Sequence, residues 1–251
     1  MRIGTRWVVM PSADEIAAAE RSGAFGLWAD VPSSGVAAAA ELAALTTDPR
    51  IVLRIVLGSE HPVTLAEEAA VLDHLSAGRV VCVVDTGALS MEGAIEDLQL
   101  LRACWSGRPV RHRGLRWQVP AGLAADLPDS VAVTPTPSQV DLPVWLTGTH
   151  APALGAGFGL PLLATQFDHA SPVAQVQPGS AELSGEVGAD RTLVSEWASV
   201  GATHLLVQPP VDDGPDLFGG YIARYLQPEV AMPQFPRIMA EAELPSRWVP
   251  A

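Results

Sequence analysis

The chain has 251 residues, of which 48% are hydrophobic and 17% are charged. This composition can bury a sizeable core, so it excludes disorder as the main state and leaves room for one large domain or two small ones. Fifteen basic residues against 28 acidic residues give a formal net charge of −13. Most of such a surface would repel a phosphate backbone or an anionic membrane, so we expect neither nucleic acid nor membrane as a partner.

The sequence also predicts a cellular location. The apolar run at residues 7–10 is too short for a signal peptide, and longer apolar stretches are interrupted by charges such as Arg54 and Asp73. We therefore expect a cytoplasmic protein. Cys82 and Cys104 have no CxxC partner and are expected to be buried thiols, and no spacing of His, Asp or Glu predicts a metal site.

Short β-branched runs alternate with helical patterns rich in Ala, Leu and Glu, which is typical of parallel βα units. The predicted strands cover residues 3–10, 25–29, 51–57, 80–84, 143–146, 161–165 and 204–208, with a weaker candidate at 173–176. The predicted helices cover residues 11–22, 36–45, 65–75, 91–106, 151–158, 192–200 and 217–226. A Pro-rich excursion at about 107–142, which includes the run from Arg111 to Trp117, lacks this periodicity. We expect it to hold one hairpin and to lie against the domain surface, either as a lid over the site or as padding.

The order of these elements predicts the fold class, which is α/β. Seven clear strands and one doubtful strand, each clear one followed by a helix or by the excursion, match a (β/α)8 barrel of the TIM type with trimmed loops. We expect residues 1–251 to form this barrel as one domain. An open doubly wound sheet is the alternative, but no GxGxxG follows the first strand and no GxxxxGK[ST] is present.

One segment carries a resemblance to a known family. Residues 72–79 read Leu-Asp-His-Leu-Ser-Ala-Gly-Arg, and weaker matches follow at 105–107, 135–139 and 143–148. Together they resemble the luciferase-like monooxygenases, flavin- and F420-dependent barrel enzymes related to bacterial luciferase. Asp73 and Arg79 flank a predicted helix end, where the arginine can satisfy exposed carbonyls and pair with a carboxylate. We therefore interpret this motif as structural.

The resemblance implies a cofactor, FMN or F420, with its phosphate near the loops after the fourth and fifth strands and its ring over the barrel mouth. Chemistry in such barrels takes place at the carboxyl ends of the strands. The residues expected there as cofactor-binding candidates are Gly58, Ser59, Asp85, Thr86, Thr147, Gly148 and Thr149. The last three fit a phosphate loop, because small residues let backbone N–H groups approach and hydroxyls can donate.

Catalytic candidates at the same edge are weaker. His61, His150 and His169 lie on predicted loops, and imidazole titrates near neutrality, although a loop histidine without a function is the more common case. Asp30 follows the second strand, where deazaflavin-using relatives often have an Asp-His pair; here the next residue is Val31. Further residues that follow predicted strands are Pro11, Ser12, Glu60, Asp168 and Gln208.

Two departures from the family pattern leave the activity open. Residues 84–90 lead almost directly into the next helix, and Asp85 would repel a phosphate dianion. The stretch between the second strand and residue 36 is also short. The chain is therefore a flavin- or F420-dependent oxidoreductase or monooxygenase for a small organic substrate, a non-catalytic homologue that serves as a partner subunit or flavin-binding protein, or a cofactor-free enzyme that uses His and Asp groups.

One predicted helix bears on assembly. Residues 36–45 are apolar on nearly every face, whereas an outer helix should present a polar stripe to water. The family commonly dimerises through its second and third helices. We therefore expect a homodimer, or a heterodimer with a homologous barrel, through residues 36–45 and 65–75; an Ala-rich surface helix selected for its helix propensity is the alternative.

Overall fold

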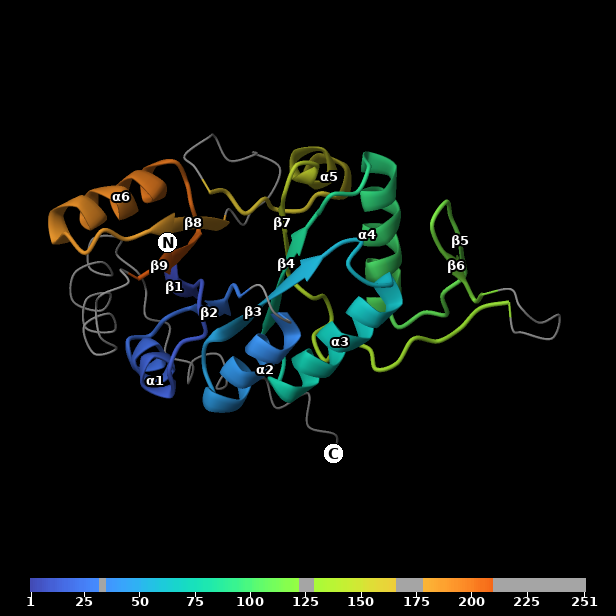
Figure 1. The fold of residues 1–251 in the computed structure, drawn as a ribbon, viewed down its shortest axis with the longest axis horizontal. Helices are drawn as coiled ribbons and strands as arrows, with labels where there is room; N and C mark the ends of the chain where they lie inside the picture. Colours follow the sequence, from blue (N-terminus) through green and yellow to red (C-terminus); the bar gives the residue numbers. More distant parts are fainter. Residues whose placement is uncertain (32–34, 122–128, 166–177, 210–251) are drawn as a thin grey trace, which may run out of the picture.

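The computed structural model describes residues 1–31, 35–121, 129–165 and 178–209. Seven parallel strands form one curved sheet in the order β7-β4-β3-β2-β1-β9-β8, with helices along its outer side (Figure 1). The strands are β1 (Arg2–Trp7), β2 (Gly26–Ala29), β3 (Arg50–Val56), β4 (Val80–Asp85), β7 (Val144–Thr147), β8 (Pro178–Glu182) and β9 (His204–Gln208). The helices are α1 (Ala13–Arg21), α2 (Gly35–Leu45), α3 (Pro62–Leu75), α4 (Met91–Trp105), α5 (Ala151–Phe158) and α6 (Val187–Ser199).

The segment 161–164 joins the two edge strands of this sheet. The Leu146 N–H donates to the Pro161 carbonyl at 2.8 Å, and the Leu163 N–H donates to the Leu146 carbonyl at 2.8 Å. On its other side, the Ala164 N–H donates to the Pro178 carbonyl at 3.0 Å. Because the segment bonds to both β7 and β8, it occupies the place of an eighth strand and closes the sheet. The predicted (β/α)8 barrel is confirmed.

Several predicted boundaries are wrong and β8 was not predicted, although the other elements follow one another in the predicted order. The first strand ends at Trp7 instead of residue 10, and the predicted strand at 161–165 is reduced to two isolated bridges. Two helices begin earlier than predicted, α3 at Pro62 and α6 at Val187. The candidates at 173–176 and 217–226 lie outside the described residues.

Two helix starts follow local sequence rules. Ser12 caps α1 by accepting from the Glu15 N–H, and the Glu15 carboxylate accepts from the Ser12 N–H at 2.7 Å, which completes a capping box. Ser90 caps α4 by accepting from the Gly93 N–H. The short loop that was predicted after β4 is confirmed, because only residues 86–90 separate this strand from α4.

The core has an inner part and an outer part. The inner part fills the barrel lumen and consists of residues from the strands and from the segment 161–164: Trp28, Val52, Val81, Val83, Trp145, Leu163 and Leu206. The outer part packs the opposite faces of the strands against the helices. Cys82 and Cys104 are buried in the outer part, as predicted, and burial raises the pKa of both thiols, that of Cys104 to about 11.

Arg79 has the structural role that its motif predicts. Its guanidinium donates to the carbonyls of Ala43 and Thr46 at 3.0 and 2.9 Å, and its Nε donates to the Ser76 carbonyl at 2.7 Å. These bonds satisfy carbonyls at the carboxyl ends of α2 and α3. The expected pairing with a carboxylate is wrong, because Arg79 has no ion pair among the described residues.

The excursion after α4 contains the predicted hairpin and lies against the surface, as predicted. Strands β5 (His112–Arg113) and β6 (Gln118–Val119) pair antiparallel. Asp73 at the carboxyl end of α3 accepts from the Ser138 hydroxyl at 2.8 Å and from the Gln139 N–H at 2.9 Å. In Figure 1 the hairpin stands on the outer side of α4, away from the sheet. No helix in the described part of the chain is long and apolar enough to span a membrane.

Candidate functional site

Four charged side chains form a continuous ion-pair chain at the carboxyl ends of β1 to β4, which we call the mouth chain. It consists of Arg6, Asp30, Arg54 and Asp85. Asp30 accepts from Arg6 Nη2 at 2.6 Å and from Arg54 Nη1 at 3.1 Å. Arg54 Nη2 in turn donates to Asp85 Oδ2 at 2.7 Å. The four strand ends therefore present alternating charges at the barrel mouth.

The pairing changes the electrostatics expected of this edge. Burial lowers the pKa of Arg54, but the hydrogen bonds and charges of Asp85 and Asp30 outweigh burial and raise this pKa above its ordinary value. Arg54 therefore carries a permanent charge, and its side chain is still 39% exposed. Arg54 offsets part of the charge of Asp85, which reduces the repulsion that this carboxylate would exert on a phosphate.

The loop after β7 packs against the end of β4. The Thr86 N–H donates to the Thr147 carbonyl at 3.0 Å, and the His150 N–H donates to Thr86 Oγ1 at 3.3 Å. Gly148 has a φ of +95°, and a Cβ at this position would lie 2.6 Å from Thr86 Oγ1 and 2.7 Å from Asp85 Oδ1. The structure thus brings together Asp85, Thr86 and residues 147–149, and only glycine fits at position 148.

The other two cofactor candidates stabilise the loop after β3. Gly58 has a φ of +83°, and a Cβ there would lie 2.7 Å from the Leu89 side chain. The Ser59 hydroxyl donates to the Val56 carbonyl at 2.7 Å. Both residues shape a turn at the barrel mouth, and no contact joins them to the mouth chain among the described residues.

The two histidine candidates in the described part of the chain form hydrogen bonds that stabilise local structure. His61 caps α3 through Nδ1, which accepts from the Val63 N–H at 3.1 Å, and its ring centre lies 4.3 Å from the Trp117 ring. His150 Nε2 lies 2.9 Å from the Leu89 carbonyl oxygen. Of the three catalytic candidates, only Asp30 belongs to the mouth chain. His169 and Asp168 lie outside the described residues.

The sequence did not identify Arg6, Arg54 or Trp28 as residues of the candidate site. A usable signal exists for Arg54, because a charge inside the apolar run Ile51–Val56 implies a side chain that points to a polar end of the lumen. Arg6 lies opposite Trp28 in the β1–β2 register, with its guanidinium carbon 4.9 Å from the centre of the indole. The ion-pair partners of Arg6 and Arg54 are determined by the register between strands that lie far apart in the sequence.

Two buried polar atoms of the lumen side lack hydrogen-bond partners among the described residues. They are Trp28 Nε1, a donor on a residue only 4% exposed, and Gln208 Oε1, an acceptor at the end of β9. A buried polar atom without a partner costs free energy unless a ligand or water satisfies it. A heterocyclic ring that both accepts and donates hydrogen bonds could satisfy the orphan donor and the orphan acceptor. The guanidiniums of Arg6 and Arg54 are compatible with an anionic substituent on such a ring. The flavin and deazaflavin cofactors have this chemistry.

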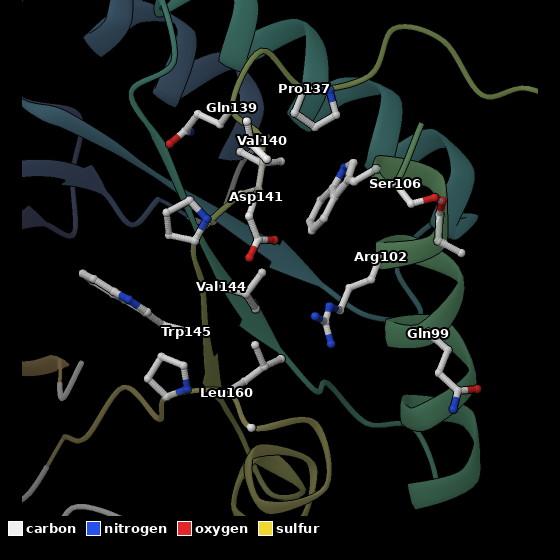
Figure 2. A pocket seen from close by; sticks show the side chains of 16 residues that line it. Gln99, Arg102, Ser106, Pro137, Gln139, Val140, Asp141, Val144, Trp145 and Leu160 are labelled. Atoms are coloured by element: carbon white, nitrogen blue, oxygen red, sulfur yellow. Dashed lines mark hydrogen bonds between the residues drawn. The ribbon is translucent and has the colours of Figure 1, made fainter. Parts of the chain in front are cut away.

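A separate cavity of about 860 Å³ lies between α4 and the beginning of β7. Figure 2 shows that the side chains of Arg102 and Asp141 both point into it. Pro143, Val144 and Trp145 line it, so it borders the amino end of β7. Because barrels of this type carry their chemistry at the opposite, carboxyl ends of the strands, we place the candidate site at the mouth.

The fold and the polar mouth define an α/β barrel whose carboxyl edge can hold a charged ligand. Residues 12–202 match the family described as luciferase-like monooxygenase, so the chain belongs to this family, as the resemblance at residues 72–79 implies. No curated protein sequence matches the chain significantly.

Solved structures support the same fold. The monooxygenase RslO1 from Streptomyces bottropensis is 16% identical, with a TM-score of 0.68, and the match covers 91% of this chain and 99% of that one. An F420-dependent secondary alcohol dehydrogenase, solved with an F420-acetone adduct, is 14% identical with a TM-score of 0.68 over 91% and 98% of the two chains. The F420-dependent tetrahydromethanopterin reductase from Methanopyrus kandleri is 12% identical with a TM-score of 0.69 over 91% and 99%.

Proposed function

We propose that this protein is a flavin- or F420-dependent oxidoreductase or monooxygenase that acts on a small organic substrate at the barrel mouth. Family membership and the activities of the similar proteins of known structure support this proposal. The observation that carries it is the orphan donor Trp28 Nε1, buried beneath the mouth chain. A reduced cofactor bound here would supply a hydride to the substrate or electrons to oxygen.

The protein's own residues would bind and orient this cofactor. Trp28 Nε1 would donate a hydrogen bond to the cofactor and Gln208 Oε1 would accept one from it, which would satisfy both orphan atoms. Residues 147–149 would hold the phosphate through their backbone N–H groups and the hydroxyls of Thr147 and Thr149, and Gly148 lets this loop pack against Asp85 and Thr86. Arg54 keeps the nearby carboxylates neutralised while the anionic group binds.

The experiment that tests this proposal compares two glycine variants by fluorescence titration with FMN and with F420. In Gly148→Ala a Cβ would clash with Asp85 and Thr86, so we expect at least about tenfold weaker binding of the cofactor. Gly157→Ala is the matched control, because a Cβ on this residue of α5 meets nothing within 4 Å. Equal affinities for the two variants would contradict the placement of the phosphate.

The same proposal includes the assembly and the location expected from the sequence. Helices α2 and α3 lie side by side (Figure 1) and expose Leu45, Val71 and Leu75, the last at 70%. Exposed apolar side chains on adjacent helices are typical of a protein interface. We propose a dimer through this surface, with a second copy or a homologous barrel, in the cytoplasm.

A further inference from the structure

The hairpin after α4 is a concentrated positive charge on an acidic protein. Four of the fifteen arginines lie within residues 108–116, and residues 107–121 contain no acidic residue, although the whole chain has a net charge of −13. The side chains of Arg108, Arg111 and Arg113 are exposed. None of these three forms an ion pair with any residue that the structure describes.

The hairpin is held in place by the backbone and by its fourth arginine. The carboxylate of Glu96 on α4 accepts from the N–H groups of Leu115, Arg116 and Trp117 at 2.9–3.1 Å. Asp97, which is fully buried, accepts from Arg116 Nε at 3.0 Å and from Trp117 Nε1 at 2.6 Å. Two acidic residues of α4 therefore fix the hairpin tip, and the three other guanidiniums take no part in this anchor.

The anchor places the hairpin tip on the outer side of α4, at the level of the carboxyl edge of the sheet. Glu96 and Asp97 lie in the first two turns of α4, the helix that follows β4, and so near the carboxyl edge of the sheet. The Trp117 ring contacts His61, which caps α3 directly after β3. The hairpin tip thus adjoins the loop that follows β3, which holds Gly58 and Ser59.

We propose that this hairpin binds an extended polyanionic tail of the ligand that occupies the mouth, with Arg111 and Arg113 as its principal contacts. This inference rests on the proposed function and narrows it. FMN ends in a single phosphate, for which the proposed site at residues 147–149 accounts, whereas F420 continues beyond its phosphodiester into a chain of glutamates. Unpaired guanidiniums at the rim attract such a chain of carboxylates. The hairpin therefore favours F420 as the cofactor.

The test measures equilibrium affinities by fluorescence for F420, for its precursor without phosphate and glutamates, and for FMN. The protein is compared with Arg111→Ala/Arg113→Ala, which leaves the Glu96 anchor intact, and with Arg21→Ala/Arg191→Ala, which removes two exposed arginines from α1 and α6. We expect the hairpin variant to bind F420 about five- to tenfold more weakly at low salt, because each exposed ion pair contributes little. The precursor should bind equally to all three proteins, and added salt should reduce the difference for F420.

Each other outcome overturns the inference and reports separately on the proposed function. If F420 binds but the two double variants lose affinity equally, general charge accounts for the loss, and the oxidoreductase proposal stands. If FMN binds and neither deazaflavin does, the tail site is excluded and a flavin enzyme remains. If none of the three ligands binds, both proposals fail, and an acidic partner protein becomes the occupant of the hairpin to examine.

Discussion

Asp30 holds two arginines that would otherwise face one another at the barrel mouth. It accepts from Arg6 and from Arg54, and its own side chain is 8% exposed. Without the charge of Asp30, the positive charges of Arg6 and Arg54 would be less well neutralised. Water would still solvate both side chains in part, because Arg6 is 25% exposed and Arg54 is 39% exposed. The carboxylate is therefore a centre of the mouth chain and not an isolated acid.

The charge of Asp30 should contribute to the stability of the folded protein. We expect Asp30→Asn to lower the free energy of unfolding by about 1–2 kcal/mol, less than for a fully buried pair because water screens both arginines. Urea unfolding measures this change. Asp14→Asn is the control, since Asp14 is exposed in the first turn of α1 and should cost only a few tenths of a kcal/mol, roughly. Equal losses for the two variants would show that the mouth chain contributes no stability.

His204 lies at the amino end of β9, at the opposite end of the barrel from the mouth chain. Burial, together with the charges of Arg2 and the N-terminus, lowers the pKa of His204 from 6.5 to about 4, and the ring packs against Phe25 and Trp145. The unfolded chain takes up a proton near pH 6.5 and the folded chain does not, so stability is complete above that pH and falls between pH 6.5 and about 4. Urea unfolding at about pH 7.5 and about pH 4.5 should show a smaller decrease for His204→Gln than for the wild type. An identical decrease would contradict a neutral His204.

At the scale of elements, the buried carboxylate of Glu96 holds the hairpin of β5 and β6 against α4. Glu96 accepts from three consecutive backbone N–H groups of the hairpin tip, and these contacts and the His112 ring outweigh burial and lower the pKa of its carboxyl. We predict that Glu96→Ala raises the rate of tryptic cleavage after Arg111 and Arg113 by about tenfold, because opening the hairpin no longer breaks these bonds. Mass spectrometry locates the cuts, and Glu92→Ala on the same helix is the control. Unchanged cleavage in Glu96→Ala would mean that the hairpin is held elsewhere.

The elements also show how far sequence reasoning reaches. Strands rich in Val and Ile, such as β3 and β4, were predicted closely because their propensity and their burial agree. Strand β8 reads Pro-Gly-Ser-Ala-Glu and was missed, because pairing with β9 forms it in spite of its composition. The ring of Trp197 lies where a side chain on Gly179 would be, so tertiary packing requires this glycine. The sequence predicts a candidate site at the carboxyl ends of the strands, but the mouth chain depends on register between distant strands, which periodicity does not contain.

For the whole molecule, the exposed surface of α2 and α3 predicts the assembly. We expect light scattering to give the mass of a dimer, and Val71→Asp/Leu75→Asp to give a monomer, because charges would be buried at the interface. Leu115→Asp is the control, since Leu115 is 86% exposed and lies on the hairpin instead of on α2 or α3. A monomeric wild type, or a double variant that remains dimeric, would contradict this interface.

The central claim is that the mouth of this barrel binds a redox cofactor. The most direct measurement is an equilibrium titration of the wild-type protein with FMN and with F420, each oxidised and anaerobically reduced, followed by absorbance and fluorescence. We predict a dissociation constant of about micromolar or tighter for one of the two cofactors. Failure of both cofactors to bind in either redox state would contradict the claim and direct attention to a partner barrel chain.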